Sequence, residues 1–128
     1  MESFHKTFGH PVGKHRNATL PLNRANLRFA LMEEENKEYI EAVKNKDIVE
    51  VADALGDMLY ILCGTIIEHG LQNKIEAVFN EIQRSNMSKL GQDGKPILRA
   101  DGKILKGPNY FKPDILSVLE SPELKSEL

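Results

Sequence analysis

Residues 31–65 read LMEEENKEYIEAVKNKDIVEVADALGDMLYILCGT, and this stretch decides the fold. Apolar residues recur at helical spacing on both sides of Asn45-Lys46, a pattern that predicts two helices joined by a short turn. Acidic residues interrupt the middle of each apolar face. The first helix carries Leu27, Leu31, Glu34, Glu38 and Ala42 on one face with Glu35 at its edge, and the second carries Glu50, Asp53, Ala54, Asp57 and Ile61 together.

These carboxylates would repel one another if the two faces packed together, and burial of an unpaired carboxylate is strongly unfavourable. Bound divalent cations would relieve the repulsion, and ligands that are all oxygen favour Mg²⁺, Mn²⁺ or Ca²⁺. The alternative is that the acids face water, as we expect for Glu33, Glu41 and Asp47. For the acids on the inner faces, exposure to water would break both apolar faces at mid-helix.

The charges are distributed unevenly, although the 128 residues carry a net charge of only −2. Residues 30–57 contain nine acids and three lysines, whereas residues 83–112 contain seven bases and two acids. The small net charge gives no general reason to bind a nucleic acid polymer or a membrane. The two halves could complement each other, or they could bind the metals and the phosphates of one ligand.

Cys63 is the single cysteine, which excludes an internal disulfide and favours an inert thiol in the core. The N-terminus does not resemble a signal peptide, and Asp53 and Asp57 interrupt the longest apolar run. We therefore expect a cytoplasmic location.

The N-terminal arm, residues 1–22, is rich in glycine and proline and predicts a loop with one helical turn near residues 3–8. Aromatic and histidine side chains, including Phe8 and His10, are concentrated in it. One interpretation is that the arm packs over the helices. The other is that its rings form a stacking platform for a base.

Capping signals predict where the two central helices begin and end. Asn23 is a predicted N-cap of a helix that runs to Lys44, and Asp47 is a predicted N-cap of a helix that ends at Gly70. Glu50 lies three residues after Asp47, the spacing of a capping box. Its side chain could therefore simply return to the Asp47 backbone.

A third helix is predicted over residues 72–87, with an apolar face that carries Ile75, Phe79, Ile82 and Asn86. The turn signals QDGK and ADGK then predict a small hairpin or flap at residues 91–109, before a short helix at 115–120.

These elements predict a single all-α domain over residues 1–128, with the arm at 1–22, a helical core at 23–88, and the flap and C-terminal segment at 89–128. Three helices of this size cannot enclose two acid-bearing faces. We therefore expect the bundle to be completed in a homodimer or homotetramer.

The motif EExxE at Glu34, Glu35 and Glu38, followed by ExxD at Glu50 and Asp53, resembles the all-α nucleoside triphosphate pyrophosphohydrolases. That superfamily includes MazG, dimeric dUTPases and phosphoribosyl-ATP pyrophosphohydrolase. FHKTFGHP, VADALGDMLYILCGTIIEHG, and RSNMSK followed by DGKPILRADGKILKGPNYFKPD are similar to its MazG-like or phosphoribosyl-ATP pyrophosphohydrolase-like branch. The resemblance covers nearly the whole chain.

The resemblance implies a role for each acid of the two motifs. Glu34 would be the base that activates water, and the Mg²⁺ ligands, with Mn²⁺ as a substitute, would be Glu35, Glu38, Glu50 and Asp53. Many relatives have the second motif directly before an LLY-like run, where this chain has Asp57 and, in the Glu position, Ala54. In that register Ala54 would break the motif, so Glu50 and Asp53 are the expected ligands and Asp57 is expected to be an acid beside the metal.

The resemblance also implies a nucleotide substrate and the products nucleoside monophosphate and pyrophosphate. The basic segment offers Arg84, Lys89, Lys103 and Lys106 for the outer phosphates, although each could equally be a solvated surface base. Further expected substrate contacts are Asn86, Asn109, Phe8 and His10.

The expected function is Mg²⁺-dependent hydrolysis of an NTP or dNTP, a dUTP-like nucleotide being one candidate. Hydrolysis of phosphoribosyl-ATP is the nearest alternative. A carboxylate di-iron protein is a rival, but such proteins use Glu-x-x-His, which neither central helix contains. A second rival is a non-catalytic metal-binding assembly module whose charged halves dock in an oligomer.

Overall fold

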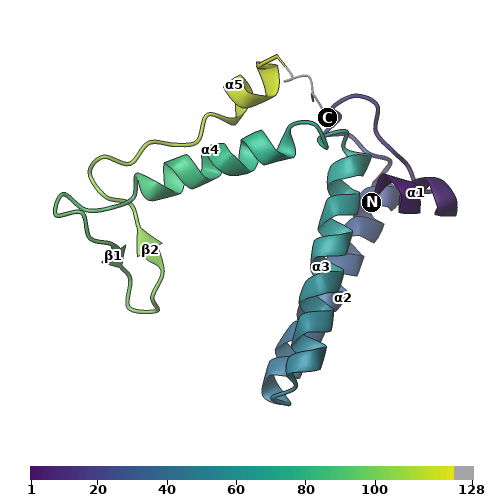
Figure 1. Cartoon of the computed structure of the whole chain (residues 1–128), viewed down its shortest axis with the longest axis horizontal. Helices are drawn as coiled ribbons and strands as arrows, with labels where there is room; N and C mark the ends of the chain where they lie inside the picture. Colours follow the sequence, from purple (N-terminus) through teal and green to yellow (C-terminus); the bar gives the residue numbers. More distant parts are fainter. Residues whose placement is uncertain (123–128) are drawn as a thin grey trace. The chain divides into compact units, whose positions relative to one another are not determined.

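The computed structural model describes residues 1–122, which form mainly helices (Figure 1). In chain order the elements of this part are α1 (Glu2–Phe8), α2 (Leu22–Lys44), α3 (Ile48–Glu68), α4 (Ile75–Met87), β1 (Ile97–Leu98), β2 (Ile104–Leu105) and α5 (Ile115–Glu120). The predicted all-α fold is confirmed. The chain divides into two compact units, Met1–Gln72 and Asn73–Leu128, which are described separately.

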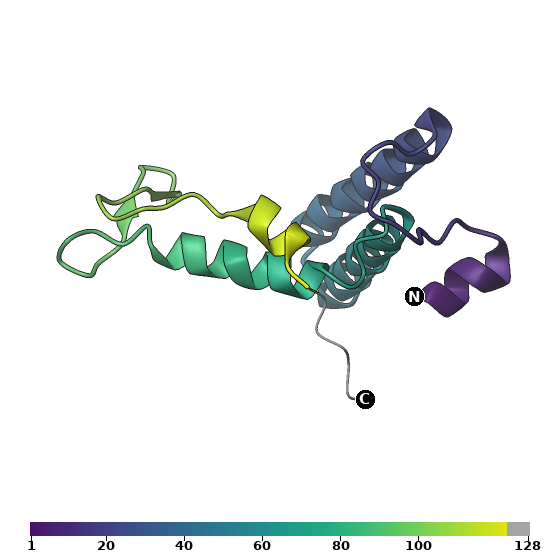
Figure 2. The ribbon, with the colours of Figure 1, turned by 90° about the horizontal axis from the view of Figure 1, so that it is seen from above.

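In the first unit α2 and α3 run side by side as a helical hairpin (Figure 2). The turn between them is short: Lys46 takes a left-handed conformation with φ 53°, and the Asp47 N–H donates to the Ala42 carbonyl at 3.1 Å. The Asp47 carboxylate then caps α3 by accepting from the N–H groups of Val49 and Glu50 at 3.1 and 3.2 Å. The predicted break and the predicted cap of the second helix are both confirmed.

The predicted cap of the first helix is wrong. Pro21 is the N-cap residue of α2, and Asn23 lies inside the helix. The Pro21 carbonyl accepts hydrogen bonds from the N–H groups of Arg24 and Ala25 at 2.9 and 3.1 Å. Proline fixes φ near the helical value, so it orders the first turn without a side-chain cap.

The N-terminal arm packs on the C-terminal end of α3, as the first of its two interpretations expects. The Gly13 N–H donates to the Ile67 carbonyl at 2.8 Å, and the Asn17 N–H donates to the His69 carbonyl at 3.0 Å. Gly13 must be glycine because a Cβ there would lie 2.6 Å from the backbone nitrogen of Gly70. Gly70 itself has φ +69°, which confirms the predicted end of this helix.

A buried ion-pair network joins α2 to the end of α3. The Glu68 carboxylate accepts from the Arg24 guanidinium at 3.0 Å and lies 3.2 Å from that of Arg28. Arg28 also donates to the Ile61 carbonyl at 2.7 Å and to the Thr65 hydroxyl at 3.0 Å. The two guanidinium groups neutralise a carboxylate whose side chain is fully buried.

We expect Gly64→Ala to destabilise the first unit by about 1–3 kcal/mol, the usual range for overpacking. A Cβ at Gly64 would lie 2.5 Å from Arg28 Nη2 and 2.7 Å from His5 Nε2, so the network would have to move. Urea denaturation measures the effect. Gly56→Ala is the matched control on α3, because a Cβ there meets open space among the described residues and should stabilise the helix. Equal stability of the two variants would contradict the prediction.

In the second unit α4 packs against the segment that leads into α5. The buried Ser85 hydroxyl donates to the Phe111 carbonyl at 2.8 Å, and the Arg84 guanidinium lies 4.3 Å from the centre of the Phe111 ring. On the predicted apolar face of this helix, Phe79 and Ile82 are exposed within the described chain. The small Ser85 allows closer backbone approach than the large residues of that face would.

The predicted hairpin is confirmed, with Ile97 opposite Leu105 and Leu98 opposite Ile104 in an antiparallel pair. Both predicted turns contain a glycine with positive φ, which only glycine adopts readily. Cys63, expected in the core, is only half-buried. Within residues 1–122, no helix combines the length and apolar character that crossing a bilayer needs.

Candidate functional site

Three acids from both helices of the hairpin meet near its middle. One carboxylate oxygen from each of Glu35, Glu38 and Asp57 lies within 4.8 Å of the others. Glu35 and Glu38 come from α2 and Asp57 comes from α3. The antiparallel packing of the two helices therefore creates this group, which we call the carboxylate cluster.

The carboxylate cluster is electrostatically unfavourable as it stands. Glu35 is half-buried, and its Oε2 atom lacks a hydrogen-bond partner among the described residues. Burial raises the pKa of Glu35 to about 7, with further increases from hydrogen bonding to Glu38 and from the negative charges of Glu38, Asp57 and Glu34. Lys37, the nearby cation on α2, pairs with Glu33 at 3.6 Å instead.

A divalent cation fits this group of residues. The cluster supplies several oxygen ligands, repulsion that a cation would relieve, and one buried oxygen without a partner. Mg²⁺ and Mn²⁺ prefer such oxygen ligands, whereas soft metals prefer sulfur or imidazole. The cluster and its chemistry therefore match a site for a hard divalent metal.

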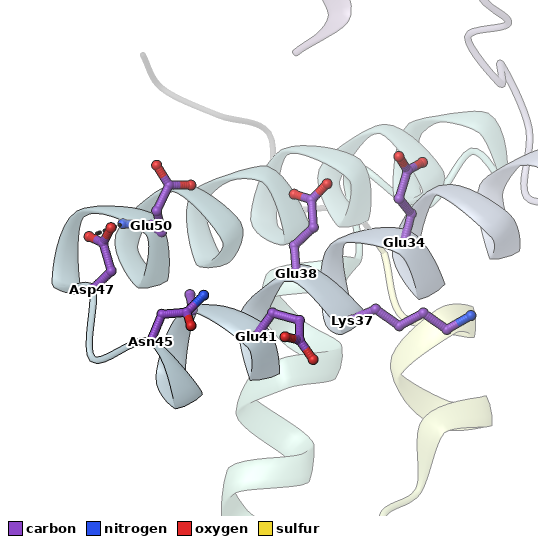
Figure 3. A pocket seen from close by; sticks show the side chains of 8 residues that line it. Glu34, Lys37, Glu38, Glu41, Asn45, Asp47 and Glu50 are labelled. Atoms are coloured by element: carbon purple, nitrogen blue, oxygen red, sulfur yellow. Dashed lines mark hydrogen bonds between the residues drawn. The ribbon is translucent and has the colours of Figure 1, made fainter.

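A cleft of about 400 Å³ lies beside the carboxylate cluster. Its lining consists of Glu34, Lys37, Glu38, Glu41, Ala42, Asn45, Asp47 and Glu50. In Figure 3 the carboxylates of Glu34, Glu38 and Glu50 point to the same side. Because Glu38 belongs to both the cleft and the cluster, a ligand in the cleft would be next to a metal in the cluster.

The carboxyl group of Glu50 does not return to the backbone of the helix cap. The Asp47 N–H, which a capping box would use, donates to the Ala42 carbonyl at 3.1 Å. Glu50 therefore keeps its carboxylate free to line the cleft. The capping-box interpretation explains the position of Asp47 but not that of Glu50.

The structure groups Asp57 with Glu35 and Glu38, whereas the sequence motif pairs them with Glu50 and Asp53. Glu50 and Asp53 are exposed on α3 and lie outside the cluster. Their assignment as metal ligands stays a prediction. The sequence signal for Asp57 was its place directly before Met58-Leu59-Tyr60.

The metal-free protein is expected to lose stability as pH rises from about 4.5 to about 7. The Glu35 carboxyl keeps its proton to about pH 7 when folded but ionises near 4.5 when unfolded, so the folded state binds more protons in this window. The loss should be on the order of 1–2 kcal/mol after solvent screening. Urea denaturation in EDTA measures it. Glu35→Gln should flatten the pH dependence, and the exposed Glu33→Gln should retain it.

The predicted phosphate-binding bases belong to the second unit. The Arg84 guanidinium donates to the Glu81 carboxylate at 2.6 and 3.1 Å, and the Lys106 ammonium lies 4.8 Å from the centre of the Tyr110 ring. Among the residues of this unit that are predicted to bind the substrate, Lys89 is half-buried. The others are exposed: Arg84, Asn86, Lys103, Lys106 and Asn109. Arg84 is therefore already engaged, while the roles of all six in substrate binding stay predictions.

The predicted base-stacking residues are in the first unit. Phe8 is exposed, with its ring centre 4.6 Å from that of Phe4. His10 is half-buried, and its ring centre lies 5.8 Å from that of Phe4. The arm thus brings aromatic rings together, and their contact with a substrate stays a prediction.

Sequence reasoning missed a second polar group, in which atoms of His5, His10 and Glu68 lie within 4.8 Å of one another. A metal is disfavoured there, because Glu68 is already paired with the guanidinium groups of Arg24 and Arg28. The sequence signal for this group was the four-residue spacing of Arg24 and Arg28, which puts both arginines on one face of the helix.

A helical hairpin with a carboxylate cluster at its centre is the architecture of the all-α nucleoside triphosphate pyrophosphohydrolases, a metal-dependent class. Residues 1–86 match the family of phosphoribosyl-ATP pyrophosphohydrolases, and the chain belongs to this family.

Proteins similar to this chain include a viral protein and a bacterial protein of known structure. "Uncharacterized protein L479" of Acanthamoeba polyphaga mimivirus is 29% identical over 93 residues, which cover 70% of this chain and 37% of that protein. The chain thus spans little more than a third of that relative. A crystal structure of a candidate NTP pyrophosphohydrolase from Exiguobacterium sp. 255-15 is 29% identical and covers 90% of this chain and 87% of its own, with a TM-score of 0.48.

Proposed function

We propose that this protein hydrolyses the bond between the α- and β-phosphates of a nucleoside triphosphate in the presence of Mg²⁺. A dUTP-like nucleotide is among the candidate substrates. The observation that supports the proposal most strongly is the carboxylate cluster of Glu35, Glu38 and Asp57 beside a cleft lined by further acids. The family match supports the same class of reaction.

The carboxylate cluster would hold the metal, with Glu50 and Asp53 as the further ligands that the sequence motif implies. When bound, Mg²⁺ neutralises phosphate charge and assists departure of pyrophosphate. The protein contributes fixed positions for the carboxylates on two packed helices, so little rearrangement is needed on binding.

Glu34 would accept the proton of the attacking water. It lines the cleft, is exposed to solvent and lies outside the carboxylate cluster, so its carboxylate is not committed to the metal. The water oxygen forms a bond to the α-phosphorus, the bond from that phosphorus to the bridging oxygen breaks, and the water proton passes to Glu34. The products are a nucleoside monophosphate and pyrophosphate.

Incubation with a panel of nucleoside triphosphates and Mg²⁺ tests this proposal. Monophosphate and pyrophosphate should appear in equal amounts. Orthophosphate with accumulation of diphosphate would mean cleavage at the γ position and would overturn it. Phosphoribosyl-ATP belongs in the panel because the family match favours it equally. If every nucleotide is unchanged, the non-catalytic assembly module becomes the better assignment.

The active form is proposed to be a homodimer or homotetramer. Among the described residues the buried apolar side chains are Ala42, Ala54 and Ile67, which make a small core. Leu55, Leu59 and Leu62 on α3 are exposed at 48%, 62% and 46% and recur at a spacing that keeps them on one side of the helix. A second copy would cover this stripe.

Leu59→Lys is expected to shift the protein toward monomer by about 100-fold or more in dissociation constant. Burial of one leucine contributes about 1.5–3 kcal/mol, and each dimer would contain two copies of the change. Sedimentation velocity over a range of concentrations measures the shift. Leu116→Lys is the control, because Leu116 is similarly exposed at 65% but lies on α5. A monomeric wild-type protein would remove the proposed interface.

A further inference from the structure

The flap at residues 91–109 contains the same five-residue loop twice. Residues 91–95 read GQDGK, and residues 99–103, which join β1 to β2, read RADGK (Figure 1). In each loop the N–H of the first residue donates to the carbonyl of the fifth at 2.8 Å. The N–H of the glycine in turn donates to the carbonyl of the first residue, at 3.0 Å in one loop and 2.8 Å in the other. We call them the first and second DGK loops.

The aspartates of the two DGK loops have matching backbone surroundings. The Oδ1 atom of Asp93 accepts from the Lys95 N–H at 3.0 Å, and that of Asp101 accepts from the Lys103 N–H at 3.1 Å. The glycine that follows each aspartate has a positive φ, +75° in the first loop and +89° in the second. A Cβ on either glycine would meet none of the described atoms within 4 Å. The two peptide bonds are therefore similarly exposed on the glycine side.

The first residue of each loop distinguishes the two aspartates. In the second DGK loop it is Arg99, whose Nε donates to Asp101 Oδ1 at 2.8 Å while its Nη2 pairs with Oδ2. This bidentate pair lowers the pKa of the Asp101 carboxyl, and a backbone N–H lowers it further. In the first DGK loop the same position is Gly91, which has no side chain. Among the described residues, a single backbone N–H donates to the Asp93 carboxylate.

An aspartate followed by glycine can rearrange without an enzyme. The backbone nitrogen of the glycine forms a bond to the carboxyl carbon of the aspartate, and one carboxyl oxygen leaves as water with the amide hydrogen and the carboxyl proton. Water then adds to the original main-chain carbonyl of the resulting cyclic imide, and the bond from that carbonyl to the glycine nitrogen breaks. The product is isoaspartate, in which the main chain continues through the side-chain carbon.

An ion pair to the carboxyl group slows the first step for two reasons. An ionised carboxylate lacks the proton that the departing water needs, and a guanidinium on both oxygens stabilises the ionised form. The pair also holds the carboxyl group in place, so its carbon cannot turn towards the backbone nitrogen. Because glycine follows the aspartate in both loops, the arginine is the feature that separates them.

We propose that Asp93 is a site of spontaneous isoaspartate formation in the folded protein and that Arg99 protects Asp101 from the same reaction. The rearrangement leaves the mass and net charge of the protein unchanged, but it adds one carbon atom to the main chain of the first DGK loop. It also displaces the carboxylate oxygen that accepts from the Lys95 N–H. The reaction uses no nucleotide, so it does not depend on the proposed function.

Ageing of the full-length protein at mildly acidic pH tests the proposal. Peptide mapping by mass spectrometry, with fragmentation that distinguishes isoaspartate from aspartate, gives the rate at each position. Asp93 should isomerise about fivefold faster than Asp101, the scale expected for one exposed bidentate ion pair. Equal rates in the folded wild-type protein would overturn the proposal, as would the absence of isoaspartate at Asp93.

Arg99→Gly makes the second DGK loop match the first and should raise the rate at Asp101 to that at Asp93. Arg99→Lys keeps the charge but not the bidentate geometry and should give an intermediate rate. Lys103→Ala is the matched control, because it removes a positive charge from the same loop without removing the ion pair, and both rates should be those of wild type. An unchanged rate at Asp101 in both Arg99 variants would overturn the protective role of Arg99.

The same measurement on the unfolded chain in urea separates the loop structure from the local sequence. Unfolding removes the ion pair, so the two positions should isomerise at similar rates. A difference that persists in urea would assign the selectivity to the neighbouring residues Gln92 and Ala100, and it would overturn protection by the folded loop.

Discussion

Glu34→Gln is expected to reduce turnover by about 10²-fold or more while Mg²⁺ and nucleotide binding stay near wild type. Glu34 lines the cleft but lies outside the carboxylate cluster, so its loss should remove the proton acceptor without removing a metal ligand. Single-turnover measurement of pyrophosphate release, together with calorimetry of Mg²⁺ binding, separates the two effects.

Glu41→Gln is the matched control for this experiment. Glu41 also lines the cleft, but its carboxylate lies 3.5 Å from the Lys44 ammonium at the exposed surface. It should keep wild-type turnover. Wild-type turnover in Glu34→Gln would exclude Glu34 as the base, and Glu35 would become the better candidate.

Mg²⁺ is expected to raise the melting temperature, and Glu38→Gln or Asp57→Asn should remove most of this response. Ligands that bind only the folded state stabilise it by mass action, by about 2.7 kcal/mol at 100 times the dissociation constant. Each substitution removes one charged oxygen ligand from the carboxylate cluster. Thermal unfolding with and without Mg²⁺ measures the response, and activity should fall in parallel.

The same measurement on Asp53→Asn compares the structural grouping with the sequence motif. The motif predicts that Asp53 is a ligand, whereas the structure places Asp57 in the cluster. Loss of the Mg²⁺ response in Asp57→Asn but not in Asp53→Asn would favour the cluster of Glu35, Glu38 and Asp57. A full response in all three variants would remove the metal site.

The sequence predicted the secondary structure well because most of its signals are local. Helical periodicity identified the two central helices, Asp47 identified the start of α3, and the DGK repeats identified the turns of the hairpin. The predicted cap at Asn23 was wrong. Asparagine is a good capping residue, but the helix begins earlier, directly after Pro21.

The details of the site depend on packing, which periodicity does not determine. The face of α3 carries several acids, and which of them meets Glu35 depends on the rotation of one helix against the other. The buried pair of Arg24 and Glu68 joins residues 44 apart, and no local pattern connects them. The open face of α4 was likewise beyond periodicity, which finds an apolar face but not what covers it.

The attachment of the N-terminal arm has a consequence for the order of folding. The α2–α3 hairpin closes over a short turn, so its contacts are local and should form early. The arm is held by bonds across much longer separations, such as the Gln72 amide to the Gly13 carbonyl, 59 residues apart, and the His69 ring to the Asn17 carbonyl, 52 residues apart. Closing such long loops costs more conformational entropy, so these contacts form more slowly than those within the hairpin. During synthesis the first residues to leave the ribosome can therefore reach their final position only after the end of α3 has emerged.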